Sequence, residues 1–253
     1  MDLVLAKMLP ASLPLYPMQT PAVNNNGRVK GALYIVSTPI GNLEDISLRA
    51  IRILKEVDLI AAEDTRRTRQ LLSHYDIHTP LTSYFDGNQD SKSEKLIARL
   101  TTGNSIALVS EAGTPTISDP GHRLVVRCID AKIDITPIPG PTACITAASV
   151  AGMPLNAFVF EGFLSPKSGK RRRQFTAVRE EKRTLIFYES PHRLMPFLQD
   201  ALEILGDRHA VVARELTKKF EEIFRGTVSE ALRNFKATPP RGEFTVLIAG
   251  NRK

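Results

Sequence analysis

The chain of 253 residues has a net charge of +7, which favours an anionic partner, and its 42% hydrophobic content is enough for two domains of about 100 to 150 residues. No apolar run approaches the roughly 18 residues that a membrane helix needs, so we expect no membrane-spanning segment. Cys128 and Cys144 occur in apolar helical patterns without metal-ligand or disulfide spacing, which predicts buried thiols in a cytoplasmic protein and no metal site.

The first 30 residues are predicted to form a disordered extension. Pro10, Pro14, Pro17 and Pro21 interrupt the apolar stretches, and Lys7 alone makes a poor positive region for a signal peptide. The folded part of the chain is therefore expected to begin near residue 31.

Residues 31–153 alternate short apolar strands with amphipathic helices. This alternation predicts a Rossmann-like α/β domain with a parallel sheet and right-handed crossovers. Either Asp45 or Ser47 is expected to cap the first helix. The expected strands are residues 31–37, 57–62, 81–85, 106–109 and 133–138, with a helix at residues 121–131 and a small-residue helix ending at Gly152.

Residues 154–253 have a different pattern and are predicted to form a second domain, with a mixed α/β sheet. Residues 220–228 fit a helix or a strand, and the alternation of E-E-I-F-R-G-T-V favours a strand. The boundary is expected near residues 152–156. The other expected elements are strands at 158–163, 184–188, 210–213 and 243–249, a basic helix at 170–181 and an apolar-faced helix around 194–205.

Three loops rich in Gly, Pro and small polar residues follow strands of the first domain, at residues 38–45, 110–121 and 139–143. Ligands of open α/β sheets bind at the carboxyl ends of strands, so these loops predict a ligand cleft. An ordinary strand-to-helix connection is the alternative for residues 110–121. Neither a Walker loop nor a G-x-G-x-x-G fingerprint is present, which argues against nucleotide hydrolysis and hydride transfer.

The motifs in and around these loops resemble those of the ribosomal RNA small subunit methyltransferase I family, from about residue 33 to residue 249. Two positions depart from the family's pattern, because Glu111 replaces an Asp and Ser165 replaces a Pro. The motifs are S-T-P-I-G-N-L-E-D-I-S-L-R-A (37–50), E-D-T-R (63–66), S-E-A-G-T-P-T-I-S-D-P-G (110–121), I-P-G-P-T-A (138–143), E-G-F-L (161–164), Y-E-S-P-H-R (188–193) and A-R-E-L-T-K (213–218).

The resemblance implies a tetrapyrrole-methylase-like enzyme with S-adenosylmethionine held in a cleft between two α/β domains. It also implies a homodimer, with 16S ribosomal RNA or the small ribosomal subunit as partner and 2′-O-methylation of a decoding-region cytidine as the reaction. By matching motif positions, the implied cofactor-binding residues are Pro39, Glu111, Ala112, Gly113, Thr114, Ile117, Ser118, Asp119, Thr142, Ala143 and Leu164.

A ribose hydroxyl is a weak acid, so a carboxylate or a neutral histidine is expected to accept its proton or to orient it. The candidates are Glu63, Asp64, Glu189 and His192, with Arg66 beside Asp64 for substrate orientation. The alternative is structural: Asp64 caps the next helix while Arg66 lies on its exposed face, and Ser190 caps another helix with Pro191 at its first position.

Positive charge is concentrated in residues 167–183, where eight Lys or Arg against two Glu leave a surplus of six. Such a segment is typical of a surface that follows a phosphate backbone, although many charge runs are only solvated helix faces. The residues expected to bind RNA are Lys167, Lys170, Arg171, Arg172 and Arg173.

Two other functions remain open from the sequence. One is a methylase of the same fold that acts on a tetrapyrrole, another small molecule or, as in diphthine synthase, a protein; such relatives typically have a G-x-G-P-G-type loop where this chain has T-P-I-G-N. The other is a non-catalytic RNA-binding ribosome assembly factor.

Overall fold

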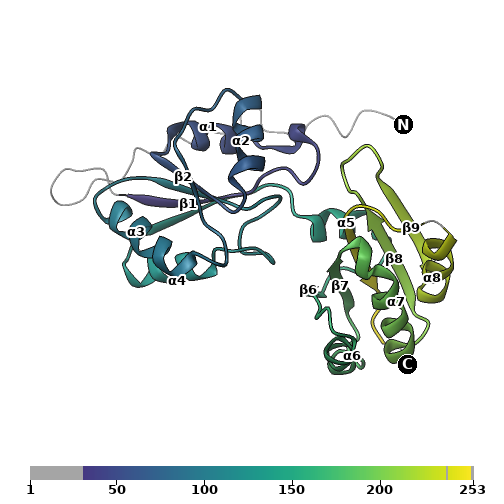
Figure 1. The fold of residues 1–253 in the computed structure, drawn as a ribbon. Helices are drawn as coiled ribbons and strands as arrows, with labels where there is room; N and C mark the ends of the chain where they lie inside the picture. The colour runs from purple at the N-terminus through teal and green to yellow at the C-terminus, as the bar shows by residue number, and fades with distance from the viewer. Residues whose placement is uncertain (1–30, 238, 252–253) are drawn as a thin grey trace, which may run out of the picture.

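The computed structural model describes residues 31–237 and 239–251, so the predicted disordered extension of residues 1–30 lies outside the described part. Two lobes lie beside each other, each built on a five-stranded sheet (Figure 1). One sheet is parallel and the other is mixed, which confirms the predicted fold class.

The first lobe contains a parallel sheet with the strand order β3-β2-β4-β1-β5. β2 and β4 are buried at every position, as expected for central strands with both faces covered. β1 lies between β4 and β5, so the loops that follow these three strands leave the sheet side by side. The strands are β1 (Ala32–Val36), β2 (Leu59–Ala62), β3 (Leu81–Ser83), β4 (Ile106–Val109) and β5 (Asp134–Ile138).

Two helices cover each face of this sheet. Leu54 of α1 and Leu72 of α2 belong to the apolar cluster on one face, and Leu100 of α3 and Leu124 of α4 belong to the cluster on the other. Ser47, one of the two predicted caps, accepts a hydrogen bond of 3.1 Å from the Ala50 N–H at the start of α1. The helices are α1 (Leu48–Glu56), α2 (Thr65–His74), α3 (Gln89–Thr101) and α4 (His122–Asp130).

The second lobe contains a mixed sheet with the strand order β6-β7-β10-β8-β9. Only the pairing of β6 with β7 is parallel. β9 confirms that the ambiguous segment near residue 224 is a strand. The strands are β6 (Phe158–Phe163), β7 (Thr184–Glu189), β8 (His209–Arg214), β9 (Glu222–Thr227) and β10 (Phe244–Ile248).

Three helices, α6 (Ser168–Ala177), α7 (Pro191–Leu205) and α8 (Val228–Ala237), pack on one face of the mixed sheet. α6 ends at Ala177, earlier than predicted, because residues 178–181 turn back toward β7. α8 is absent from the sequence prediction, although its apolar residues recur at helical spacing and could have indicated it: Val228, Ala231, Leu232 and Phe235.

The other face of the mixed sheet is covered by α5 (Ala143–Ala151), which the sequence assigned to the first domain. Cys144, Ala147 and Ala151 of α5 pack with Ile186 of β7 and Leu247 of β10 in one apolar cluster. We therefore place the boundary between the lobes at residues 139–142, before α5, instead of near residue 153.

Both cysteines are buried free thiols, as predicted. Within residues 31–237 and 239–251, we find no helix with both the length and the apolar character needed to cross a bilayer.

Candidate active site

The loops after β1 and β4 are joined by a two-residue bridge. The Thr38 N–H donates to the Gly113 carbonyl at 2.8 Å, and the Gly113 N–H donates back to the Thr38 carbonyl at 3.0 Å. Gly113 has a φ of +87°, and a Cβ there would lie 3.3 Å from the Ile40 side chain. Only glycine can adopt this positive φ without strain and also leave room for the Ile40 side chain.

The hydroxyl of Thr114 ties all three loops together. It lies 2.9 Å from Ser37 Oγ and 2.6 Å from Thr142 Oγ1, and it is within 3.2 Å of the Pro141 carbonyl. Gly140 packs tightly here, because a Cβ at this position would lie 2.9 Å from the Cβ of Ser37. The three loops thus form one preorganised rim at the carboxyl ends of β1, β4 and β5.

The loop after β4 stores backbone strain. Thr116 and Ser118 have positive φ angles of 74° and 66°, and such residues cost on the order of 1–3 kcal/mol each. Ser118 packs against the second lobe, since a Cβ at Gly162 would lie 2.6 Å from Ser118 Oγ. Strain of this kind is concentrated at binding and catalytic sites in proteins, which points to this loop.

A pocket of about 380 Å³ opens between this rim and the strand ends of the second lobe. The first lobe provides its loops, and the second provides the carboxyl ends of β6, β7 and β8, the start of α7 and the start of β10. The lining residues are Ile40, Glu63, Glu111, Ala112, Gly113, Thr114, Ile117, Asp119, Thr142, Ala143, Phe163, Tyr188, Glu189, Ser190, Pro191, Ala213, Leu216, Glu243, Phe244 and Thr245.

Most of the residues implied by the resemblance meet in this pocket, and three do not line it. Leu164 is only 2% exposed and belongs to the core of the second lobe, Ser118 packs against Gly162, and Pro39 precedes the lining residue Ile40. The members that do line the pocket are Glu111, Ala112, Gly113, Thr114, Ile117, Asp119, Thr142 and Ala143.

The sequence interpretation missed the floor of the pocket, which is formed by residues of the second lobe: Tyr188, Ala213, Leu216, Phe244 and Thr245. Tyr188, Ala213 and Leu216 occur in motifs that the resemblance includes, so their motifs could have indicated them. Phe244 and Thr245 carry no such signal, because they belong to a strand that is buried at every position.

Five carboxyl groups line the pocket and make it electronegative: Glu63, Glu111, Asp119, Glu189 and Glu243. Burial, followed by the charge of Glu63, raises the pKa of Asp119 to about 7, although a hydrogen bond from Ser110 opposes the shift. Burial also raises the pKa values of Glu63 and Glu189. With Glu111 these groups form an environment that favours a cationic ligand.

Asp64 and Arg66, expected to orient substrate, lie outside the pocket lining. The Asp64 carboxylate accepts hydrogen bonds from the backbone N–H groups of Arg66 (2.7 Å) and Arg67 (3.2 Å). These two bonds cap α2 and lower the pKa of Asp64. The side chain of Arg66 is exposed. Arg67, the next residue, forms an ion pair of 2.7 Å with Glu111 at the pocket.

Of the three remaining candidates, two line the pocket and one does not. Glu63 and Glu189 line the pocket, whereas His192 is exposed on the first turn of α7 and does not. Glu63 Oε2 accepts from the Glu111 N–H at 3.1 Å, and Glu189 Oε1 accepts from the Ser190 N–H at 2.8 Å. Arg193 lies 3.1 Å from Glu189, so each carboxylate is held in place.

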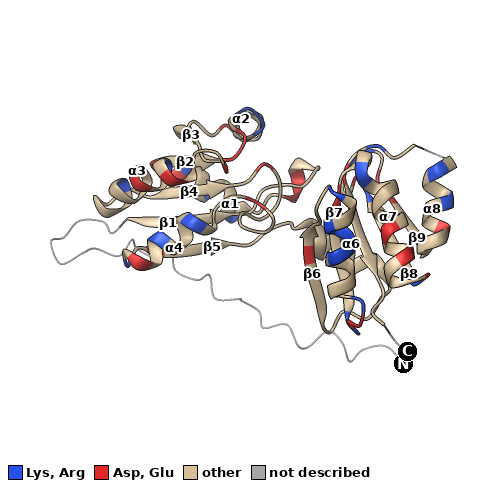
Figure 2. Cartoon of the chain, turned by 60° about the horizontal axis from the view of Figure 1, so that its bottom comes forward, with Lys and Arg blue, Asp and Glu red and all other residues tan. Residues whose placement is uncertain are grey.

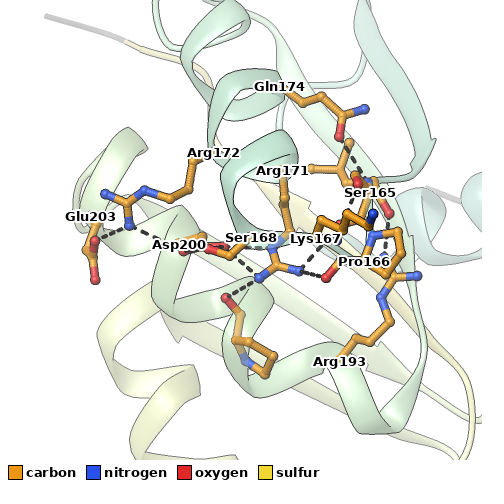
Figure 3. Close-up of polar contacts among 12 residues, drawn as sticks. Ser165, Pro166, Lys167, Ser168, Arg171, Arg172, Gln174, Arg193, Asp200 and Glu203 are labelled. Carbon is orange, nitrogen blue, oxygen red and sulfur yellow. Dashed lines mark hydrogen bonds and ion pairs between the residues drawn. The ribbon is translucent and has the colours of Figure 1, made fainter.

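The structure corrects the expectation that Arg171 binds RNA. Its side chain is 2% exposed, with its guanidinium 2.6 Å from the Asp200 carboxylate (Figure 3). The same guanidinium donates to the carbonyls of Ser165, Pro166 and Pro196. Arg171 therefore fastens α6 and its leading loop to α7.

The remaining basic residues of this segment are accessible to different extents. Arg172 is partly buried and pairs with Asp200 at 3.3 Å and with Glu203. Lys167, Lys170 and Arg173 are exposed, and the blue colour of Lys and Arg marks the ribbon of α6 in Figure 2. The positive surface of α6 is thus narrower than the sequence predicts.

Comparison with known proteins identifies the relatives of this chain. Residues 32–232 match the family model of tetrapyrrole (corrin/porphyrin) methylases. The ribosomal RNA small subunit methyltransferase I of Halalkalibacterium halodurans is 51% identical over 222 residues, which cover 88% of this chain and 77% of the relative. The protein of the same name from Thermotoga maritima is 49% identical, with 87% and 99% covered.

Solved structures share the two-lobed fold at low identity. Cobalt precorrin-4 methyltransferase, an enzyme of cobalamin biosynthesis, has a TM-score of 0.64 at 18% identity and covers 86% of this chain and 94% of its own. A diphthine synthase has a TM-score of 0.66 at 11% identity, with 87% and 90% covered. Through its pocket motifs and its relatives at about half identity, the chain belongs to the ribosomal RNA small subunit methyltransferase I family, within the tetrapyrrole methylases.

Proposed function

We propose that the protein transfers a methyl group from S-adenosylmethionine to the 2′-hydroxyl of a cytidine in the decoding region of 16S ribosomal RNA. The observation that carries the proposal is the interlobe pocket, which is lined by residues of the family's motifs. The basic helix α6 begins a few residues after the lining residue Phe163. Relatives at about 50% identity carry the name of a small subunit ribosomal RNA methyltransferase.

The pocket suits S-adenosylmethionine in size and charge. Its volume of about 380 Å³ lies in the range of roughly 300 to 1,000 Å³ typical of small-molecule sites. Gly113 fixes the rim through its two hydrogen bonds with Thr38, and Ala213 and Leu216 offer an apolar floor. Asp119 and Glu111 would stabilise the positive sulfur, whose methyl group is the electrophile that S-adenosylmethionine supplies.

The protein's main contribution to methyl transfer is positioning. An in-line displacement needs the ribose oxygen and the methyl carbon about 3 to 3.5 Å apart and aligned. Of the four candidate groups for holding the hydroxyl, Glu63 and Glu189 reach the pocket. Glu63 is our choice, because one of its oxygens is fixed by the Glu111 N–H while Glu189 is already engaged by Arg193. Its raised pKa makes it a stronger base than an ordinary carboxylate.

Lys167, Lys170 and Arg173 are the residues that we propose bind the RNA phosphates. They are exposed on α6 and its leading loop, which continue from β6 at the pocket. Phosphate contacts of this kind position an RNA without reading its sequence. The proposal also includes a homodimer in the cytoplasm, and light scattering coupled to gel filtration measures that oligomeric state.

The experiment that tests the proposal is methyl transfer to the assembled substrate. Small ribosomal subunits that lack the modification are incubated with the protein and with S-adenosylmethionine labelled in its methyl group. We expect the label in 16S ribosomal RNA. A protein that binds the subunits but leaves them unlabelled would be an assembly factor, and in that case a thermal shift assay should show no stabilisation by the cofactor.

A further inference from the structure

Phe163, the last residue of β6, is more exposed than the other large apolar residues that line the pocket. Its side chain is 53% exposed although it lines the pocket. The floor residues Ala213, Leu216 and Thr245 are buried. Phe163 therefore lies at the mouth of the pocket on the side of the second lobe, where part of its ring faces solvent.

The ring of Phe163 rests on a fixed aromatic neighbour. Its centroid lies 5.5 Å from that of Tyr188, with an angle of 58° between the rings. Tyr188 also packs edge-on against Phe160 at 4.9 Å, and its hydroxyl accepts a hydrogen bond of 3.0 Å from the Cys144 N–H of α5. Tyr188 is thus held by Phe160 and by the Cys144 N–H, and its ring packs against the ring of Phe163.

Along the chain, Phe163 ends β6 at the pocket, and the short loop 164–167 connects it to the basic helix α6. Leu164 is anchored in the core directly after Phe163, and the Arg193 guanidinium donates to the Leu164 carbonyl. Lys167 and α6 follow within a few residues. An RNA strand whose phosphates bind α6 would therefore pass over the exposed ring before its ribose reaches the pocket.

We propose that Phe163 is the stacking surface for the nucleobase of the nucleotide that is methylated. The inference rests on the proposed RNA methylation and goes one step beyond it. Proteins that recognise single-stranded RNA hold unstacked bases on exposed aromatic rings. Stacking on Phe163, with the phosphates on α6, would direct the 2′-hydroxyl into the pocket.

The first test separates substrate binding from cofactor binding. Removing a stacking ring should raise the KM for RNA about tenfold or more, a typical loss for one base on an aromatic side chain. We expect this result for Phe163→Ala, with an unchanged KM for S-adenosylmethionine, and recovery in Phe163→Tyr. Phe220→Ala is the matched control, since Phe220 is 67% exposed and does not line the pocket.

The second test uses the absence of tryptophan from the sequence. Phe163→Trp introduces a single indole, whose fluorescence should be quenched when a single-stranded oligoribonucleotide containing the decoding-region cytidine is added. Phe220→Trp should show no such change. Quenching of Phe163→Trp by S-adenosylhomocysteine alone would assign the ring to the adenine of the cofactor and overturn the proposal.

The two proposals fail in different ways. If the wild-type protein labels ribosomal RNA but Phe163→Ala keeps the wild-type KM for RNA, the stacking role is wrong and the RNA methylation stands. If the wild-type protein does not label RNA, the proposed function is wrong, and the stacking role falls with it.

Discussion

The guanidinium of Arg171 and the carboxylate of Asp200 form an ion pair of 2.6 Å that is almost completely buried between α6 and α7. Ser168 Oγ donates to the same carboxylate at 3.0 Å, and Arg172 approaches its other oxygen at 3.3 Å. This arrangement holds the helix that we propose presents the RNA.

Replacing Asp200 by Ala should destabilise the second lobe strongly. Removal of one partner leaves the Arg171 charge buried and unpaired, which typically costs about 3–5 kcal/mol. Urea unfolding measures the free energy. Arg173→Ala, an exposed change on the same helix, should stay within about 0.5 kcal/mol of wild type. Equal stability of the two variants would show that Asp200 does not hold α6.

Reversing the exposed charges of α6 should weaken RNA binding and spare cofactor binding. Lys170→Glu combined with Arg173→Glu removes two proposed phosphate contacts, so RNA affinity should fall and its dependence on salt concentration should decrease. Filter binding and calorimetry measure the two affinities.

The matched control is Arg233→Glu combined with Lys236→Glu. It makes the same change in net charge on α8, which packs on β9 at the edge of the sheet farthest from β6. A comparable loss of RNA affinity in both double variants would mean that overall charge, and not the position of α6, governs binding.

Gly113→Ala should impair cofactor binding. The positive φ of Gly113 and the nearby Ile40 side chain leave no unstrained place for a methyl group, and the strain is about 1–2 kcal/mol. Calorimetric titration with S-adenosylhomocysteine should show weaker binding.

Gly169→Ala provides the control, because a Cβ at Gly169 meets nothing within 4 Å and the residue lies in α6. This change should leave cofactor affinity unchanged. Wild-type affinity in Gly113→Ala would contradict the assignment of this rim to the cofactor.

Stability should depend on pH through Asp119, whose pKa is raised from 3.8 to about 7. Between these values the folded protein keeps the proton and the unfolded chain has lost it, so this group's contribution to stability decreases as the pH rises through that window. Asp119→Asn should therefore gain thermal stability relative to wild type at pH 8 and lose this advantage at pH 4. A constant difference across this range would show that the group titrates normally.

The same titration should affect ligand binding. An ionised Asp119 stabilises a cation, so S-adenosylmethionine should bind wild type more tightly as the pH rises through about 7. In Asp119→Asn this gain should be smaller, because the variant carries no charge at any pH. Equal pH dependence in the two proteins would place the sulfonium away from Asp119.

Much of the first lobe follows from local patterns. Alternating apolar strands and amphipathic helices define its elements, and the polar loops after β1, β4 and β5 mark the pocket. The sequence did not reveal which sheet α5 packs on. A helix of small residues such as Ala147 and Ala148 has no distinct polar face, so its sequence does not show which face is buried. Only the three-dimensional packing assigns α5 to the second sheet.

The error at Arg171 has a physical explanation within the helix. Arg171 lies four residues before Phe175, on the same face, and Phe175 is buried. Lys170 and Arg173 are three residues apart on another face, which is exposed. Helical spacing could therefore have separated the structural arginine from the accessible cations, whereas its partner Asp200, on another helix, could not be predicted from local sequence.

The most direct measurement of the central claim is the chemical identity of the methylated nucleoside. Small subunits treated with the protein and labelled S-adenosylmethionine are digested to nucleosides and analysed by mass spectrometry. We predict one labelled product, 2′-O-methylcytidine, absent when Glu111 and Asp119 are both replaced by Arg to repel the cofactor. A methyl group on a base nitrogen would contradict the account.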